Sequence, residues 1–387
     1  MELAGTPSSL RESVSTDHQG GRTAAVRAVS LADARDPAFR DEWTQLAQRA
    51  SEPNPFFEPW FLLPSLEAFA GEGNAPQLLA FTYEGRLTGL MPLSFSRDYY
   101  GYPVPFMTGW LHANAFYGAP LVARGFEHSF WHALLDHCDR NLGTSAFLHL
   151  PLLKAGGALD AALAHVFEQT GRPSAIVARQ ERAMLRSELS PEEYLAQALS
   201  KKHAKELRRQ RRRLADHGDL RFEPQTGADG LDRWIARFLA LEAAGWKGDA
   251  GSALASEEAT RSFFTEVLLG AAEAGKLERA TLTLDGKPIA MLASFVTYPG
   301  CFSFKTAFDE RFHAHSPGMQ LQIDNLSILD RPDIDWTDSC AAEGHPMIDR
   351  LWTERRHLVT RNVAIGGAAR RTLARLLMAF ETRKGRP

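Results

Sequence analysis

Two segments of the chain repeat one pattern of apolar and polar positions. Residues 80–92 read AFTYEGRLTGLMP, and residues 281–293 read TLTLDGKPIAMLA. Each has an apolar run, an acidic residue followed by Gly, a basic residue and a second apolar run, and Gly tolerates the positive φ of a tight hairpin turn. A helix-period segment precedes each one, at 59–70 and 259–275. The pattern predicts two β-hairpins and suggests duplication of one α/β unit, with a chance likeness of two hairpins as the alternative.

Helical and strand patterns alternate through the rest of the chain. Between the hairpins we expect a helix, a buried strand and a second helix, at 130–143, 145–153 and 156–171. After the second hairpin we expect strand, loop, helix, strand, short helix, strand and helix, at 301–309, 310–318, 319–330, 334–341, 346–352, 355–365 and 367–383. This alternation predicts an α/β or α+β fold built in layers.

Two serines predict the starts of helices in the middle of the chain. Ser190 is followed by Pro191 and Glu193, the arrangement of a capping box with Pro in the first turn. Ser200 predicts the start of a second helix, which ends at Gly218.

Length and composition predict a globular protein of two domains. The chain has 387 residues, of which 44% are hydrophobic and 24% charged, and this length exceeds the usual size of one hydrophobic core. We place a disordered leader at 1–24, where Ser, Thr and Gly are frequent. The N-terminal domain is expected at 25–185, and the C-terminal domain, which carries the candidate site, at 186–387.

Charge and cysteine spacing argue against several classes of protein. A formal net charge of -3 disfavours a protein that coats nucleic acid. Cys138, Cys301 and Cys340 lie far apart and form no CxxC pair, so we expect no metal site and no disulfide framework. The chain shows neither the apolar region of a signal peptide nor an apolar run of about 18 residues, so we expect no membrane span. These features predict a reducing, cytoplasmic location.

One basic segment contrasts with this acidic average. Residues 201–213, KKHAKELRRQRRR, hold eight Lys or Arg and one Glu. In a helix these cations would lie on almost every side, and their mutual repulsion is unfavourable unless an anion or an acidic surface faces them. Coenzyme A, a phosphorylated substrate, a tRNA and an anionic lipid are the alternative partners, and a solvated helix whose aliphatic stems cover the core is the other interpretation. Arg209 in this segment is a candidate substrate-binding residue.

The strand–loop–helix segment at 301–330 contains the sharpest candidate site. Ser316, Pro317 and Gly318 lie where the helix is expected to begin, with Ser as N-cap and Pro in the first position. A helix N-terminus offers unpaired N–H groups and about half a positive charge, so it binds phosphate, and Gly lets the backbone approach a ligand. We predict that these three residues bind a cofactor; a cap without a ligand is the alternative.

Lys305 lies on the strand before that loop, among phenylalanines. The ammonium group of Lys305 must form an ion pair, reach water or lie in a cleft, because the burial of an unpaired charge is costly in free energy. By alternation Lys305 shares a face with Ser303 and Ala307, which fits a strand that lines a pocket; an edge strand facing water is the alternative. Asp309 is placed to pair with Lys305 or Arg311.

Further candidates lie on turns and strand ends. Trp246 and Lys247 form an aromatic and basic tip after a helix, and such tips clamp substrates or cap cores. Asp338 at the end of its strand and His345 behind it are candidate bases, because an attacking amine must lose a proton. Negative charge develops on the oxygen of the group that the amine attacks, and a backbone N–H at a splayed strand would stabilise this charge. The predicted catalytic residues are Lys305, Asp309 and Asp338, and the predicted substrate-binding residues are Trp246, Lys247, Arg209 and His345.

Taken together, these segments resemble the BioF2-like, or CelD-like, bacterial acetyltransferases, a GNAT family related to the FemAB aminoacyl ligases. The resemblance covers roughly residues 40–365 and rests on NPFFEPWF, GLMPL, WLHANAFYGAPLV, LSKKHAKELRRQRRRLADHG, LEAAGWKG, FKTAFDERFHAHSPGMQLQIDNL and DRLWTERR. It implies two tandem GNAT-like domains in a FemAB-like arrangement, acyl transfer and an acyl-CoA donor, often in exopolysaccharide or envelope biosynthesis.

The resemblance places Ser316, Pro317 and Gly318 at the cofactor-facing helix start, and Lys305, Asp309, Trp246 and Lys247 at positions that line the cleft. The loop HAHSPG has one glycine, so the usual GNAT pyrophosphate motif of Gln or Arg followed by two spaced glycines is absent. We expect transfer of an acetyl or other acyl group from acyl-CoA to an amine or hydroxyl of a small molecule or sugar precursor. The alternatives are a FemAB-type ligase that uses aminoacyl-tRNA and a non-catalytic scaffold that binds a phosphorylated precursor.

Overall fold

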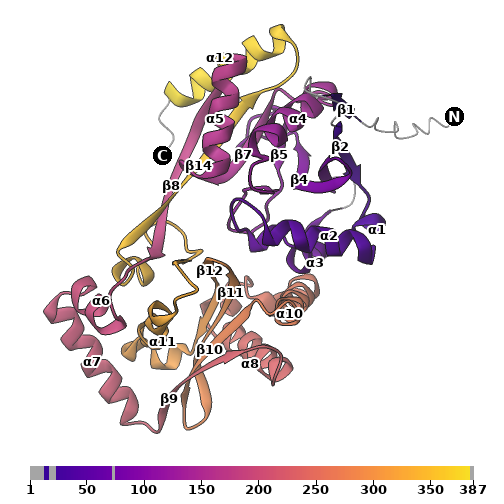
Figure 1. Cartoon of the computed structure of the whole chain (residues 1–387). Helices are drawn as coiled ribbons and strands as arrows, with labels where there is room; N and C mark the ends of the chain where they lie inside the picture. The colour runs from indigo at the N-terminus through magenta and orange to yellow at the C-terminus, as the bar shows by residue number, and fades with distance from the viewer. Residues whose placement is uncertain (1–12, 17–22, 72–74, 384–387) are drawn as a thin grey trace. The chain divides into compact units, whose positions relative to one another are not determined.

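The computed structural model describes residues 13–16, 23–71 and 75–383, and both predicted hairpins form in it (Figure 1). The first joins β3, Gln77–Tyr83, to β4, Arg86–Ser96. The second joins β10, Leu277–Leu284, to β11, Lys287–Thr297. In both turns the acidic residue has a φ of 49° and the following glycine a φ near 75°: 78° at Gly85 and 71° at Gly286. Each ladder also carries a register shift just before its turn. The likeness between the two segments therefore extends from sequence to backbone geometry.

The chain divides into two compact units whose bounds differ from the expected domains. Unit 1 contains residues 1–59, 70–179 and 358–387, and unit 2 contains 60–69 and 180–357. The last segment belongs to unit 1 because β14, Glu354–Ala364, pairs antiparallel with β7, Phe147–Lys154. Helix α3, Pro59–Phe69, supplies the aromatic rings that unit 2 packs on Phe295 and Phe304. Pairing and packing between distant segments, rather than chain order, set the units.

Unit 1 is a sheet flanked by helices. Its strands follow the order β1-β2-β3-β4-β5-β7-β14, with β6 beside β4, and the strands not yet given are β1 Ser13–Thr16, β2 Thr23–Val29, β5 Phe106–Gly109 and β6 Leu121–Val122. Its helices are α1 Leu31–Ala34, α2 Pro37–Gln48, η1 Pro55–Phe57, α4 Glu127–Arg140, α5 Ala158–Thr170 and α12 Ala368–Arg383. Residues 1–12 and 17–22 of the expected leader lie outside the described residues, whereas 13–16 form β1, antiparallel to β2.

Unit 2 contains a mixed set of parallel and antiparallel strands. Its strands follow the order β8-β13-β12-β11-β10-β9, and those not yet given are β8 Ser174–Leu185, β9 Leu220–Thr226, β12 Gly300–Phe308 and β13 Trp336–Asp338. Its other elements are α6 Pro191–Ala198, α7 Lys201–Ala215, α8 Leu231–Ala243, α9 Trp246–Asp249, η2 Leu254–Ser256, α10 Glu258–Glu273, η3 Glu310–His315, α11 Pro317–Asp324, η4 Asn325–Asp330 and η5 Ile348–Arg350. Within the described residues no helix is both long and apolar enough to span a bilayer.

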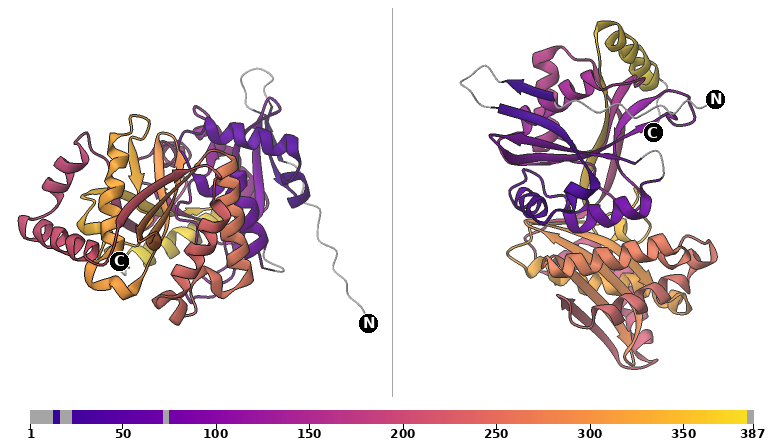
Figure 2. Two further views of the ribbon diagram at one scale, coloured as in Figure 1. Left: turned by 90° about the horizontal axis from the view of Figure 1, so that it is seen from below. Right: turned by 90° about the vertical axis from the view of Figure 1, so that its right-hand side faces the viewer.

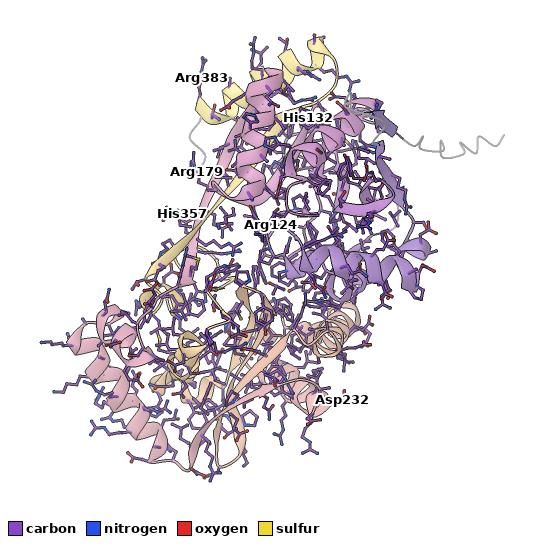
Figure 3. The ribbon with its side chains drawn as sticks, viewed as in Figure 1. Arg124, His132, Arg179, Asp232, His357 and Arg383 are labelled. Atoms are coloured by element: carbon purple, nitrogen blue, oxygen red, sulfur yellow. The ribbon has the colours of Figure 1, made fainter. Side chains whose placement is uncertain are left out.

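Helices cover both faces of the unit 2 sheet (Figure 1, Figure 2). On one face Trp234 of α8 donates from Nε1 to Oγ1 of Thr281 at 2.9 Å. On the other face Leu282 packs with Leu214 of α7 and Leu321 of α11. Neighbouring strand residues point to opposite faces, so α8 and α10 lie on one side and α7 and α11 on the other. Asp232, in the first turn of α8, is exposed to solvent (Figure 3).

Two of the three predicted helix caps form as expected. Ser190 makes the complete capping box with Glu193, and Ser200 accepts a hydrogen bond from the His203 amide. Ser316 occupies the cap position of α11 but has left-handed backbone angles, φ 52° and ψ 56°, and its side chain makes no capping hydrogen bond. The prediction of a side-chain cap at Ser316 is therefore wrong, because a capping serine needs extended backbone angles to reach the following amides.

Candidate active site

Strand β12 is longer than its parallel neighbour β13, which ends after pairing with the first three residues of β12. Parallel pairing with β13 is limited to Gly300–Phe302 against Trp336–Asp338. Pairing with β11 on the other side continues as far as Phe308. Beyond Phe302 no strand among the described residues pairs with the β13 side of β12. Because β13 ends at Asp338, this edge of β12 is open from Ser303 onward.

A β-bulge lies at the same place. In the β11–β12 ladder Ser294 faces Ser303, but the next residue of β11, Ala293, faces Lys305, so Phe304 is the extra residue. Neighbouring residues of β11 point to opposite faces, so Ser303 and Lys305 do as well. The prediction that these two side chains share a face is therefore wrong: one inserted residue reverses the alternation.

Lys305 lies on the sheet face covered by α8, in an environment that favours its neutral form. The pKa of Lys305 is lowered from 10.5 to about 8, chiefly by burial and also by the nearby ammonium of Lys247. The carboxylate of Glu242 acts in the opposite direction. Desolvation penalises the charged form of a lysine, so a substantial fraction of Lys305 is neutral near pH 8. A neutral amine at this position can accept a proton.

Glu242, a residue that the sequence analysis missed, holds Lys247 beside Lys305. Its side chain is buried, and Oε1 accepts a hydrogen bond from Nζ of Lys247 at 2.7 Å. Oε2 accepts from the amide of Leu254 at 2.8 Å. A glutamate facing inward at the end of an amphipathic helix, five residues before a lysine, is the signal that points to this pair.

Trp246 lies beside the loop that follows β12. Its amide donates to Oε1 of Glu310 at 2.7 Å, which ties α9 to η3, and the residue is 58% exposed. The structure therefore brings both residues of the predicted tip close to β12. Trp246 is hydrogen-bonded to Glu310 in the loop after β12. Lys247 is paired with Glu242, and both lie near Lys305 of β12.

The start of α11 lines a groove of about 400 Å³. One wall is formed by Ser316, Pro317 and Gly318, and other walls by α7 and by residues 346–350, including Arg350. Nε2 of Gln320 donates to the carbonyl of Leu207 at 3.0 Å, which fixes α11 against α7. The first amides of a helix have no acceptor within the helix, so the groove meets a positive helix end. The structure thus brings the predicted cofactor residues next to the basic helix.

Gly318 allows close packing in this groove. A Cβ at this position would lie 3.2 Å from Sδ of Met347 and 3.2 Å from Cδ1 of Phe308. Such contacts are shorter than the usual separation of about 3.5–4.0 Å between carbon atoms. The absence of a side chain therefore brings α11 against β12 and the 346–350 segment.

Asp309 caps the turn after β12 and pairs with Arg311. Its carboxylate accepts hydrogen bonds from the Arg311 amide at 3.0 Å and from Nη2 of the Arg311 side chain at 2.6 Å. These bonds hold the pKa of Asp309 below its usual value, although burial acts against them. A carboxylate with a lowered pKa is a weak base, so this geometry favours a positioning role.

Asp338 is completely buried between two arginines. One carboxylate oxygen, Oδ2, lies 2.6 Å from Nη2 of Arg182 and 3.2 Å from Nε of Arg356. The other, Oδ1, accepts from the Cys340 amide at 2.9 Å. A side chain with no exposed surface and two cationic neighbours cannot reach an acceptor from solvent. The arrangement is that of a buried ion-pair network, and it disfavours the predicted role of Asp338 as a base.

The remaining predicted substrate-binding residues have local partners. Arg209 donates from Nε to Oε2 of Glu206 at 2.9 Å on the surface of α7. Nδ1 of His345 accepts from the amide of Met347 at 3.4 Å, in the segment that borders the α11 groove. Neither residue lies in the Lys305 cluster defined by Lys305, Lys247 and Glu242.

Unit 2 is a mixed α/β unit in which the parallel partner of β12 ends and leaves one edge of that strand open. Residues 201–326 match the family model described as an acetyltransferase (GNAT) domain, and this segment includes Lys305, Ser316 and Gly318. The chain therefore carries a GNAT-type acetyltransferase domain and is an acyltransferase, which confirms the expected class.

Solved structures share the fold over most of the chain. FemX is 10% identical, with a TM-score of 0.54 over 88% of this chain and 98% of that one. The C-terminal DUF2156 domain of a putative lysylphosphatidylglycerol synthetase from Agrobacterium fabrum is 13% identical, with a TM-score of 0.54 over 91% and 97%. A conserved protein of unknown function from Bacteroides thetaiotaomicron is 12% identical, with a TM-score of 0.53 over 87% and 99%. The comparison with curated proteins gives no match. These likenesses confirm the predicted fold class.

Proposed function

We propose that unit 2 transfers an acyl group from an acyl-CoA thioester to an amine or hydroxyl by direct attack within a ternary complex. The observation that carries this proposal is the edge of β12 beyond Phe302, where pairing with β13 stops while β12 continues past a bulge to Lys305. A thioester held along this edge would meet backbone N–H groups, which stabilise the negative charge that develops on its oxygen.

The α11 groove is the proposed site of the donor's diphosphate. Its residues fit an anion: the helix end is positive, and His203, His313 and Arg350 line the same groove, against one carboxylate from Glu206. Coenzyme A supplies the activated acyl group when it is bound. The amides of Gly318 and Met319, together with Arg350, would hold its phosphates.

The Lys305 cluster is the proposed acceptor side. It lies on the α8 face of the sheet, whereas α11 lies on the other, so donor and acceptor would meet at the open edge of β12. A bond forms between the acceptor nitrogen or oxygen and the thioester carbon, the carbon–sulfur bond breaks, and the acceptor proton passes to the neutral amine of Lys305. The leaving thiolate takes a proton from solvent. Lys247 and Glu242 would position Lys305, and Trp246 would contact the acceptor.

The acceptor is proposed to be a small molecule, or a precursor of a polysaccharide or of the cell envelope. The cytoplasmic location stays a prediction.

The alternative function is that of a ligase that takes aminoacyl-tRNA, since the chain shares its fold with FemX and α7 carries the basic run. Release of free thiol from acyl-CoA supports the proposal. Binding of charged tRNA that weakens steeply with salt, without thiol release, supports the ligase.

A matched pair of substitutions at Ser316 tests the donor site. Asp and Asn both tolerate the left-handed backbone at this position, and only Asp adds a negative charge beside the proposed diphosphate. We expect Ser316→Asp to weaken coenzyme A binding about tenfold or more, while Ser316→Asn binds as the wild type does. Thermal unfolding with and without coenzyme A measures the difference. Equal stabilisation of both variants would remove the diphosphate from this groove.

A further inference from the structure

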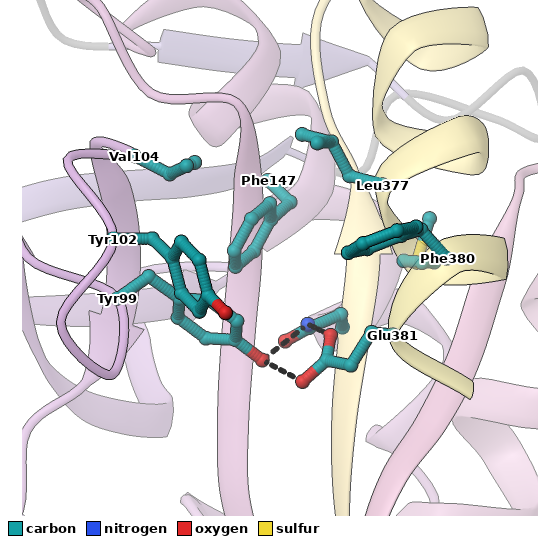
Figure 4. A pocket seen from close by; sticks show the side chains of 9 residues that line it. Tyr99, Tyr102, Val104, Phe147, Leu377, Phe380 and Glu381 are labelled. Carbon is teal, nitrogen blue, oxygen red and sulfur yellow. Dashed lines mark hydrogen bonds between the residues drawn. The ribbon is translucent and has the colours of Figure 1, made fainter. Parts of the chain in front are cut away.

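Unit 1 contains a small pocket between β7, β14, α12 and the loop that holds Tyr99 and Tyr102 (Figure 4). Its volume is about 130 Å³, close to the roughly 150 Å³ of an apolar cavity that accommodates a benzene-sized molecule. All of its lining residues belong to unit 1, whereas the proposed acyl-transfer site belongs to unit 2. Acyl transfer therefore does not account for this pocket.

The walls of the pocket are largely aromatic. Tyr99, Tyr102, Phe147 and Phe380 present their rings to it (Figure 4). Tyr99 and Phe147 are buried and pack edge to face, with ring centroids 4.9 Å apart. Tyr102 and Phe380 are 48% and 57% exposed, so the pocket opens to solvent between them. Aromatic faces carry a negative quadrupole and attract a cation placed over them.

A single carboxylate lies among these rings. Oε1 of Glu381 accepts a hydrogen bond from Tyr99 Oη at 2.7 Å, and Oε2 accepts from Asn362 Nδ2 at 3.1 Å. Asn362 also donates to Tyr99 Oη at 2.8 Å, and its Oδ1 lies 2.7 Å from Nδ1 of His149. Burial and the bond to Glu381 raise the pKa of Tyr99, so the phenol stays protonated as a donor. This network fixes the direction in which the Glu381 carboxylate points.

The Glu381 carboxylate has capacity for a further partner. A carboxylate has about four acceptor sites, and the network occupies two of them. Within residues 13–16, 23–71 and 75–383, no Lys, Arg or His nitrogen forms an ion pair with Glu381. A charge in mostly apolar surroundings is costly unless a counter-ion compensates it.

We propose that this pocket binds an organic cation, an alkylammonium group of about the size of trimethylammonium, between the rings of Tyr99, Tyr102, Phe147 and Phe380 and the carboxylate of Glu381. A neutral ligand would leave the charge of Glu381 uncompensated, and an anion would be repelled by it. The opening between Tyr102 and Phe380 lets a longer substituent on the cation extend into solvent.

Three probes of one shape and different charge test the proposal on the full-length protein: choline, 3,3-dimethyl-1-butanol and 3,3-dimethylbutanoate. Ligand-observed NMR titrations give the dissociation constants. We expect choline to bind about five- to tenfold more tightly than the alcohol, and the carboxylate to bind more weakly than the alcohol. Equal affinity for choline and the alcohol, or no binding of choline, would overturn the proposal.

Substitutions on α12 assign the binding to this pocket. Glu381→Gln keeps the size of the side chain and should remove the preference for choline. Phe380→Leu keeps an apolar side chain at an exposed position, so the fold is retained, and should reduce the same preference at least twofold. Leu373→Ala, at an exposed residue of α12 outside the pocket, is the matched control and should change nothing. A preference for choline that is unchanged in Phe380→Leu would place the cation elsewhere.

Discussion

Replacing Lys305 with Met is expected to lower kcat by about 10²–10⁴-fold, the range in which a positioned general base contributes. Met has a similar length and no charge, so this partly buried position stays filled. Thiol release from acyl-CoA with a saturating amine acceptor measures the effect. Lys287→Met, at an exposed lysine of the β10–β11 hairpin, is the matched control and should keep the activity of the wild type.

The pH dependence separates a base from a cationic binding group. Since the neutral amine is the base, kcat of the wild type should rise as the pH increases through about 8 and level off above it. In Lys305→Met this step should disappear. Lys305→Arg should not restore activity, because a guanidinium stays charged. If Lys305 instead held an anion through its charge, activity would fall above pH 8, and that profile would contradict the assignment.

Asp338→Asn is expected to destabilise the protein by about 3–5 kcal/mol, because it leaves Arg182 and Arg356 buried without their counter-ion. Asn preserves the shape of the side chain, so the loss of charge is the main change. Urea unfolding followed by circular dichroism measures the change in the free energy of unfolding.

Asp309→Asn is the matched control for this prediction. Asp309 is buried, but the side chain of its partner Arg311 is 85% exposed, so solvent screens this ion pair and its contribution is small. Asn also retains the ability to cap the turn. Equal stability of the two variants would show that the buried network around Asp338 does not stabilise the fold. A large loss of kcat with unchanged stability in Asp338→Asn would instead restore its predicted role as a base.

Local chemistry was sufficient to predict much of the fold. The Glu84-Gly85 and Asp285-Gly286 turns form as expected, because two neighbouring residues with positive φ define such a turn by themselves. The capping box of Ser190 forms for the same reason: all its partners lie within three residues. The blocks that carry the family resemblance led to the GNAT class, which the family match confirms.

The arrangement of the site depended on contacts between distant segments. The bulge at Phe304 is a property of the β11–β12 pair, so alternation along β12 alone placed Lys305 and Ser303 on one face. Asp338 meets its two arginines only because β8, β13 and β14 come together in space.

The sequence by itself determined the two hairpins, the capping box of Ser190 and the class of the protein, because turns, caps and family motifs depend on neighbours a few residues apart. Tertiary structure alone decided which side chains become buried partners, how far β12 and β13 stay paired and which unit holds residues 358–387. Burial and pairing set the charge state of Lys305, and both arise only when segments far apart in the chain pack together.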